Sequence, residues 1–159
     1  MRRSIVLSVL MLSACIQHKP PPMAPPPVNP NQAGNDKAYQ KVLADIAGHE
    51  TEPAKQVFKN IKLPMLQDVP AKTLLNIMNM GYARALGVSC LHCHTMGDFA
   101  SDDKREKRAA REMALMVRSI NDALGKMENL EGEAQEHVAN CNMCHRGHVD
   151  PHEGEQAHK

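Results

Sequence analysis

The sequence predicts an all-α fold, on three observations. Two long segments, 71–86 and 102–124, place apolar residues at the spacing of one helix face. No segment shows the alternation of apolar and polar residues that is typical of a half-buried strand. The sequence Cys-x-x-Cys-His occurs twice, at residues 90–94 and 141–145, and five residues of this kind fit on one or two helical turns.

The first fourteen residues resemble a bacterial lipoprotein signal peptide. Arg2 and Arg3 precede the apolar run 5–12, and the segment ends in small residues before Cys15. This run is much shorter than the roughly 20 residues that a membrane-spanning helix needs. We expect cleavage before Cys15 and lipidation of its side chain. The alternative is an ordinary signal peptide with an incidental cysteine, and either one takes the chain out of the cytoplasm.

Residues 15–36 are expected to form a tether, because seven of the eleven prolines lie between Pro20 and Pro30. Such segments adopt an extended polyproline conformation and act as spacers. The folded domain is predicted at residues 37–149, and the tail 150–159 is predicted to be disordered.

The first half of the predicted domain contains weak helix signals. Residues 37–50 are expected to form a short helix. Residues 57–69 are expected to be extended or irregular, because Pro64 interrupts them.

A stronger helix is predicted at residues 71–86. Pro70 is placed to open it, and Gly87 is placed to end it. Its apolar positions follow helical spacing: Leu75, Met78, Tyr82, Ala85 and Leu86.

The longest helix is predicted from Asp102 to Leu124, with Asp102 and Asp103 in its first turn and Gly125 after its end. The acidic segment 128–137 is expected to be a loop or a short helix. The apolar positions of the helix are Met113, Met116, Val117, Ile120 and Leu124.

The composition leaves little bulky material for a core. The chain of 159 residues has two Phe, two Tyr and no Trp, although its 11 Met partly compensate. Lys plus Arg number 19 and Asp plus Glu number 18, a balance that argues against a nucleic-acid surface. A large apolar group that is not an amino acid would complete such a core.

A Cys-x-x-Cys-His sequence can hold haem covalently. The two thiols add to the two vinyl groups of the porphyrin, and the adjacent histidine reaches the iron from the same side. We call Cys90, Cys93 and His94 the first motif, and Cys141, Cys144 and His145 the second motif. The sequence therefore predicts two haem c groups, with His94 and His145 as proximal iron ligands.

Other uses of paired cysteines explain the sequence less well. A zinc site would leave both following histidines as coincidence, and the 47 residues between Cys93 and Cys141 exceed the spacing of a compact zinc ribbon. Two disulfides or a thioredoxin-like redox motif would not need the histidines either, and the sequence lacks a βαβ pattern.

The sixth ligand of each iron is less well specified. Met78 and Met80 are candidates for the first haem, and Met78 is preferred because it lies on the apolar face. Met113 and Met116 are candidates for the second haem, and His137 is an alternative ligand shortly before Cys141. Methionine ligation raises the potential of a haem.

Four segments, "VFKNIK", "ALGVSCLHCH", "FASDDKREKRAAREMALMVRSIN" and "CNMCHRG", resemble the cytochrome c subunit of photosynthetic reaction centres and its smaller bacterial relatives. The resemblance runs from about Val57 to Gly147. It implies a mostly helical fold with haems in series that pass electrons. The family's first methionine in the "ARRM…M" segment, a haem ligand there, falls on Met113.

The chain also departs from this family pattern. The reaction-centre subunit carries four haems, whereas this chain has two motifs and resembles half of it. The family's usual methionine before "LGV" falls on Asn79, between Met78 and Met80. The segment between Met113 and Cys141 is a few residues longer than in the family.

These observations predict an electron carrier rather than an enzyme: an exported dihaem c-type cytochrome. Its partners would be other redox proteins of the membrane or periplasm, with the lipid on Cys15 holding it to the periplasmic side of a bacterial membrane. The alternatives are a dihaem enzyme such as a peroxidase, or a haem-based redox or gas sensor. The basic run Lys104, Arg105, Lys107, Arg108 and Arg111 is expected to be a solvated helix face, with a docking surface for an acidic partner as the alternative.

Overall fold

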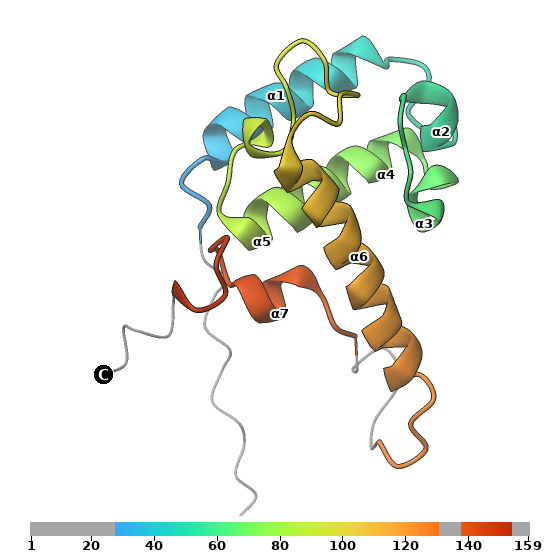
Figure 1. Cartoon of the computed structure of the whole chain (residues 1–159). Coiled ribbons are helices and arrows are strands. Elements are labelled where there is room, and N and C mark those ends of the chain that lie inside the picture. Colours follow the sequence, from blue (N-terminus) through green and yellow to red (C-terminus); the bar gives the residue numbers. More distant parts are fainter. Residues whose placement is uncertain (1–27, 131–137, 154–159) are drawn as a thin grey trace, which may run out of the picture.

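The structure, a computed structural model, describes residues 28–130 and 138–153. These residues form helices and no strand, as predicted for an all-α fold, with isolated bridges between Pro53 and Pro70 and between Thr95 and Asp98. Within these two ranges, no helix combines the length and the apolar character needed to cross a bilayer. The helices are shown in Figure 1: α1 (Gln32–Asp45), α2 (Ala54–Val57), α3 (Pro64–Gln67), α4 (Ala71–Asn76), η1 (Ile77–Ala83), α5 (Arg84–Leu86), η2 (Cys90–His92), α6 (Arg105–Leu124) and α7 (Cys141–His145).

The folded part of the chain begins earlier than predicted. α1 starts at Gln32 rather than near Lys37. Ahead of it, the buried Asn29 donates from Nδ2 to the main-chain oxygens of Ala83 (3.0 Å) and Val88 (2.9 Å). Residues 29–36 therefore belong to the packed domain and not to the tether, while the predicted signal peptide, Cys15 and the start of the tether lie outside the described residues.

The central helix spans α4, η1 and α5 without a break, as predicted for residues 71–86. Pro70 precedes its first residue, and Gly87 ends it in the left-handed conformation with φ of 68°. Its middle, Ile77–Ala83, is a π-helix rather than an α-helix. Short π segments are rare and occur often at functional sites.

Two local predictions need correction. Pro64 does not interrupt an extended segment; it stands at the start of α3, where a proline costs no hydrogen bond. α6 begins at Arg105, so Asp102 and Asp103 precede the helix instead of occupying its first turn. The end of α6 at Gly125 is as predicted.

The first residues of the tail 150–159, which was predicted to be disordered, are ordered in the structure. Within the predicted tail, Glu153 donates its main-chain N–H to the oxygen of Asp150 (3.2 Å), and the N–H of His152 donates to Asp150 Oδ1 (2.9 Å). Residues 150–153 thus form a turn. Residues 154–159 and most of the acidic segment, 131–137, lie outside the described residues.

The hydrophobic core is small, as the composition suggests. Leu63, Leu66 and Leu74 are buried together with Ala54, and partly buried side chains such as Phe58 pack around them. Burial of a leucine side chain contributes about 1.5–3 kcal/mol, so these few residues provide limited stabilisation. α6 contributes little to this core: Leu115 and Ile120 on its surface are 47% and 40% exposed.

Candidate haem site

The first motif lies in the turn that follows the central helix. Cys90 starts the short helix η2, and His94 follows it. The buried Asn35 of α1 holds this turn: its Nδ2 donates to the oxygen of Val88 (2.9 Å), and its Oδ1 accepts from the N–H of Cys90 (3.0 Å). α1 therefore fixes the position of the first cysteine.

The ring of His94 is oriented by the chain that follows it. Its Nδ1 lies 3.0 Å from the main-chain oxygen of Phe99, and its ring centroid lies 5.0 Å from the ring of Phe99. Burial lowers the pKa of His94, so the imidazole is neutral at pH 7. A neutral ring that donates from Nδ1 leaves the lone pair of Nε2 free to bind a metal.

The second motif repeats this arrangement on α7. Asn140 caps the helix by accepting from the N–H of Asn142 (3.0 Å). Nδ1 of His145 lies 3.1 Å from the main-chain oxygens of both His148 and Val149. Both histidines of the motifs therefore have main-chain acceptors at Nδ1, and no described residue forms a hydrogen bond with either Nε2.

Two cavities border the first motif. The larger, of about 440 Å³, lies toward α1, and the smaller, of about 120 Å³, lies toward α6. Cavities of a few hundred Å³ with mostly apolar walls are the usual form of a cofactor site. Both are lined by Cys90, His94, Met78, Leu74, Ile61 and Phe99.

A third cavity, of about 400 Å³, borders the second motif through Cys141. α6 faces it with Ala114 and Val117, and Leu63 and Leu66 form its other side. Cys144 and His145 do not line it, and Cys144 is exposed. The second site is thus more open than the first.

The four motif cysteines are free thiols in this structure. Burial raises the pKa of Cys90, Cys93 and Cys141, so these groups are protonated at pH 7. Among the described residues, no three or more His, Cys, Asp or Glu side chains come together in a way that could hold a metal ion. The two pairs are therefore not gathered into one zinc site.

Tyr82 lies between the two motifs. Its side chain lines the small cavity of the first motif and the cavity of the second motif. Burial, together with the nearby thiols of Cys141 and Cys93, raises the pKa of Tyr82 to about 12. The central helix therefore contributes to both sites, Met78 to the first and Tyr82 to both.

The methionine candidates occupy different positions. Met78 lines both cavities of the first motif, whereas Met80 is 49% exposed and its sulfur accepts from Gln32 Nε2 (3.9 Å). Asn79, at the family's methionine position, is buried and bound to α1 through Asp36 (2.9 Å). Of the candidates at the first site, Met78 is the one that faces the cavities.

The candidates for the second haem are not brought to the second motif in this structure. Met113 and Met116 are 39% and 44% exposed and do not line the cavity beside Cys141. Their neighbours Ala114 and Val117 face it instead. His137, the alternative ligand, lies outside the described residues.

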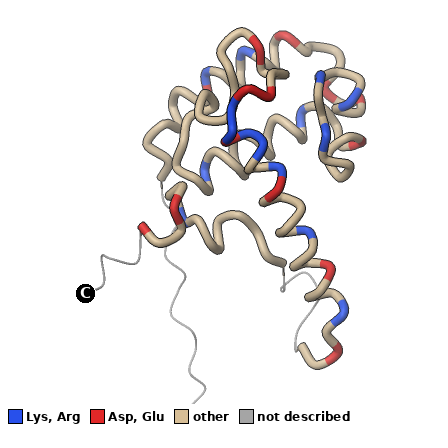
Figure 2. Tube along the Cα trace, viewed as in Figure 1, with Lys and Arg blue, Asp and Glu red and all other residues tan. Residues whose placement is uncertain are grey.

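The prediction that the basic run is a solvated helix face is wrong for two of its members. Figure 2 shows the basic residues together at the start of α6. Lys107 and Arg111 point into the protein, with side chains 10% and 17% exposed, and both line the small cavity of the first motif. Arg105 and Arg108 are exposed, as expected.

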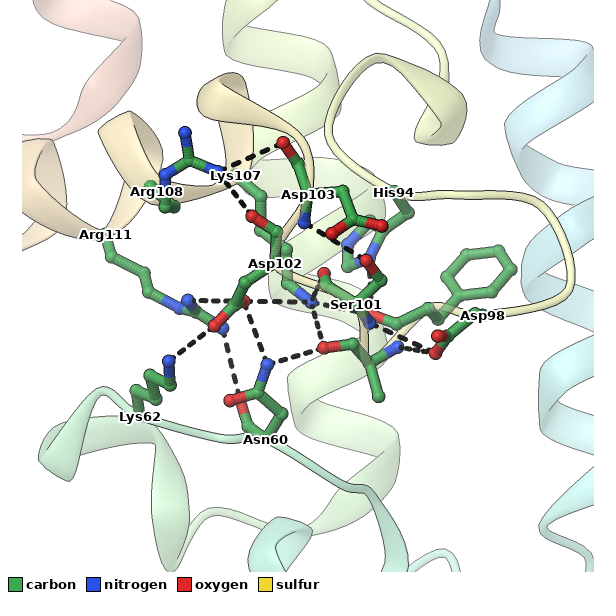
Figure 3. Close-up of polar contacts among 12 residues, drawn as sticks. Asn60, Lys62, His94, Asp98, Ser101, Asp102, Asp103, Lys107, Arg108 and Arg111 are labelled. Atoms are coloured by element: carbon green, nitrogen blue, oxygen red, sulfur yellow. Dashed lines mark hydrogen bonds and ion pairs between the residues drawn. The ribbon is translucent and has the colours of Figure 1, made fainter.

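Asp102 binds the inward-facing basic residues. Its Oδ1 lies 2.7 Å from Arg111 Nη1 and 3.7 Å from Lys107 Nζ, and its carboxylate also binds Lys62 and Asn60 (Figure 3). The hydrogen bond from Lys62, followed by those from Arg111 and Asn60, keeps the pKa of Asp102 well below its usual value. Asp102 thus ties the chain before α3 to α6.

Residues 24–157 match the protein family described as "Photosynthetic reaction centre cytochrome C subunit". The chain belongs to this family. It is also 27% identical over 135 residues to cytochrome c-554 of Chloroflexus aurantiacus; the match covers 84% of this chain and 30% of that protein. No solved structure matches the chain.

Family membership confirms the resemblance that the sequence motifs indicated, and a cytochrome c family implies covalently bound haem c. The residues of the first motif fit that group, since Cys90, Cys93 and His94 all line one apolar cavity and the imidazole is oriented by a main-chain oxygen. At the second motif the imidazole is oriented in the same way, but only Cys141 borders the cavity.

Sequence reasoning missed several residues of the first site. Asn35 falls in the predicted tether, and nothing in its local sequence links it to Cys90, 55 residues away. Phe99 acts through its main-chain oxygen, which any residue would supply. Tyr82 was identified only as part of an apolar helix face.

Proposed function

We propose that the protein is a dihaem c-type cytochrome that accepts one electron at a time from a reduced partner protein and passes it to an oxidised one. The observation that carries this proposal is the repeated histidine geometry. Both His94 and His145 follow a pair of free thiols directly and have a main-chain acceptor at Nδ1, and no residue in the described ranges bonds to either Nε2. A disulfide pair or a zinc site made of four cysteines would use no histidine and would require neither feature.

The cysteines provide the attachment. In each motif the two thiols would each add across one vinyl group of the haem, the sulfur bonding to one vinyl carbon and the hydrogen going to the other, so that no atom leaves. His94 and His145 would hold the iron through Nε2. Haem, when bound, supplies an iron centre that changes its charge by one electron.

Methionine sulfur is the proposed sixth ligand at both sites. Met78 is proposed for the first site, supported by its place in both adjoining cavities. Met113 is proposed for the second site on its family position, with Met80 and His137 as the less favoured alternatives at the two sites. Two fixed ligands limit rearrangement of the site during electron transfer, which suits a carrier.

We further propose that the protein acts on the periplasmic side of a bacterial membrane, with Cys15 as a lipid-bearing residue and the proline-rich segment as a spacer. This proposal rests on the sequence before residue 28. Its partners would be other redox proteins, including those of photosynthetic electron transfer, in keeping with the family.

The experiment that tests haem attachment is intact mass under denaturing conditions. The wild-type mass should exceed that of the mature polypeptide by two haems. The double variant Cys90→Ala/Cys93→Ala should lose one of them and much of its helical structure, because the group is part of the core. His92→Ala, a change inside the first motif that removes no attachment atom, should keep both. A mass without added haem, together with one bound zinc per chain, would refute the proposal.

A further inference from the structure

Lys107 is a charged side chain buried beside the first motif. Only 9% of the residue is exposed, and its ammonium group lies against the loop that joins the first motif to α6 (Figure 3). Desolvation, an effect of this burial, lowers the pKa of Lys107. A buried ammonium is costly unless its donors are satisfied, so its position requires an explanation.

All three donors of this ammonium are used on main-chain oxygens. Nζ of Lys107 lies 2.8 Å from the oxygen of Phe99, 3.0 Å from that of Ala100 and 2.7 Å from that of Ser101. An ammonium has three N–H groups, and each of them has an acceptor here. Lys107 therefore holds three consecutive peptide groups in place, and Asp102, 3.7 Å away, partly balances its charge.

One of these oxygens is the acceptor for the proximal histidine. The oxygen of Phe99 lies 3.0 Å from His94 Nδ1 and 2.8 Å from Lys107 Nζ. A carbonyl oxygen has two lone pairs and can accept from both donors. Lys107 and His94 are thus connected through a single oxygen atom.

We infer that Lys107 is a positioning residue for His94, which fixes the Phe99 carbonyl against Nδ1 and raises the potential of the first haem. This inference rests on the proposed function, in which His94 binds the iron. An ammonium that shares the carbonyl draws electron density from it, so the carbonyl is a weaker acceptor for the Nδ1–H of His94. A histidine with a weaker acceptor is a poorer electron donor to the metal, which favours the reduced state.

The positive charge of Lys107 also raises the potential of the first haem. A buried positive charge near the site opposes the extra positive charge of the oxidised iron, and burial reduces the screening of this effect. The weakened acceptor and the buried charge both predict that removal of Lys107 lowers the potential of the first haem.

The second motif offers an internal comparison. His145 also has main-chain acceptors, the oxygens of His148 and Val149, both at 3.1 Å. Among the described residues, no lysine donates to either of these oxygens. The proposed effect of Lys107 is therefore restricted to the first haem.

The experiment is a redox titration, followed in the visible spectrum, of the holoprotein and of two variants. Lys107→Met removes the ammonium and keeps an unbranched side chain. Arg108→Met removes one positive charge from the next position of α6, where the exposed guanidinium binds the oxygens of Asp102 and Asp103 but not that of Phe99. Denaturing mass first establishes how many haems each protein carries, which separates a failure of the proposed function from a failure of this inference.

In Lys107→Met, one of the two redox waves should move to lower potential and the other should stay in place. Arg108→Met should move neither wave by a comparable amount. The inference is overturned if no wave moves, if both move equally, or if the two variants behave alike while both haems are present.

A measurement on the wild type covers the case in which Lys107→Met does not fold. In the reduced protein with ¹⁵N-labelled histidine, the Nδ1–H of His94 should exchange with deuterium more slowly than that of His145. The reason is that exchange requires this hydrogen bond to open, and Lys107 limits opening by fixing the Phe99 carbonyl, even though it makes that oxygen a weaker acceptor. Equal or faster exchange at His94 would contradict a positioning role.

Discussion

Gly87 and Gly147 are in direct main-chain contact. A Cβ atom added to Gly87 would lie 2.0 Å from the oxygen of Gly147, and the N–H of Gly147 donates to the oxygen of Ala85 (2.8 Å). Gly87 ends the helix that contains Met78, and Gly147 follows the second motif by two residues. This contact joins α5 to α7, which lie side by side in Figure 1, and so joins the two candidate haem sites.

Gly87→Ala should destabilise the protein by about 2–4 kcal/mol, more than backbone strain alone, because φ of 68° and the contact with Gly147 both exclude a side chain. Gly97→Ala is the matched control: φ is 80°, but nothing lies within 4 Å of the added atom, so only the strain of about 1–2 kcal/mol remains. Denaturant unfolding followed by circular dichroism measures both losses. Equal losses would mean that the contact between the glycines does not matter.

Asp102→Asn should lower stability near neutral pH and lose this effect in acid. The folded pKa of Asp102 lies below its usual value of 3.8, so its stabilising effect is fully present above that value. The effect then declines as the pH falls toward the folded pKa. The difference in melting temperature between wild type and variant should therefore be steady from about pH 8 to pH 5 and narrow below about pH 4.

Asp103→Asn provides the control for Asp102, since it removes a neighbouring exposed carboxylate that forms no ion pair with any residue the structure describes. Its melting temperature should follow that of the wild type at every pH. A difference between wild type and Asp102→Asn that grows on acidification would contradict the sign of the pKa shift.

Met78→Ala should remove part of the far-red sulfur-to-iron band of the oxidised protein and lower one potential. Axial ligands move haem potentials over a range of about 0.8 V, so the loss of a sulfur ligand is readily measured. Met80→Ala is the control, because Met80 is 49% exposed and lies outside both cavities. If Met80→Ala alone removes the band, the proposed ligand of the first haem is wrong.

Met113→Ala tests the second site and the carrier function together. It should remove the part of the far-red band that comes from the second haem and allow carbon monoxide to bind the reduced protein, whereas the reduced wild type should bind it poorly. Met116→Ala should have neither effect. A far-red band of undiminished intensity in Met113→Ala would favour His137 as the ligand. Rapid stoichiometric binding of carbon monoxide to the reduced wild type, with turnover of peroxide, would favour an enzyme over a carrier.

Cys15→Ser should release the protein from membranes and leave its visible spectrum unchanged, because the lipid is proposed to be attached at Cys15 and the haems far from it in sequence. The measurement is the distribution of the protein between membrane and soluble fractions after a high-salt wash. Retention of the variant in the membrane fraction would show that another feature holds it there.

The sequence by itself determined the features that depend on local order. Helical spacing predicted the central helix and α6, and Pro70, Gly87 and Gly125 marked ends that the structure confirms. Five consecutive residues define each motif, so Cys-x-x-Cys-His could be identified without a fold. The family followed from the same segments, because it depends on residues in fixed order and not on their contacts.

Only the tertiary structure decided which distant residues meet. Asn35 reaches Cys90 only because α1 folds back on the first motif. In the same way, His94 and Lys107 share the Phe99 oxygen only because the chain folds back between them. Lys107 was misjudged for the same reason: a basic residue in a charged helix segment is predicted to face water, and its burial requires three main-chain oxygens that sequence spacing does not reveal. Local sequence fixes spacing along a helix, but burial is fixed by what packs against that helix.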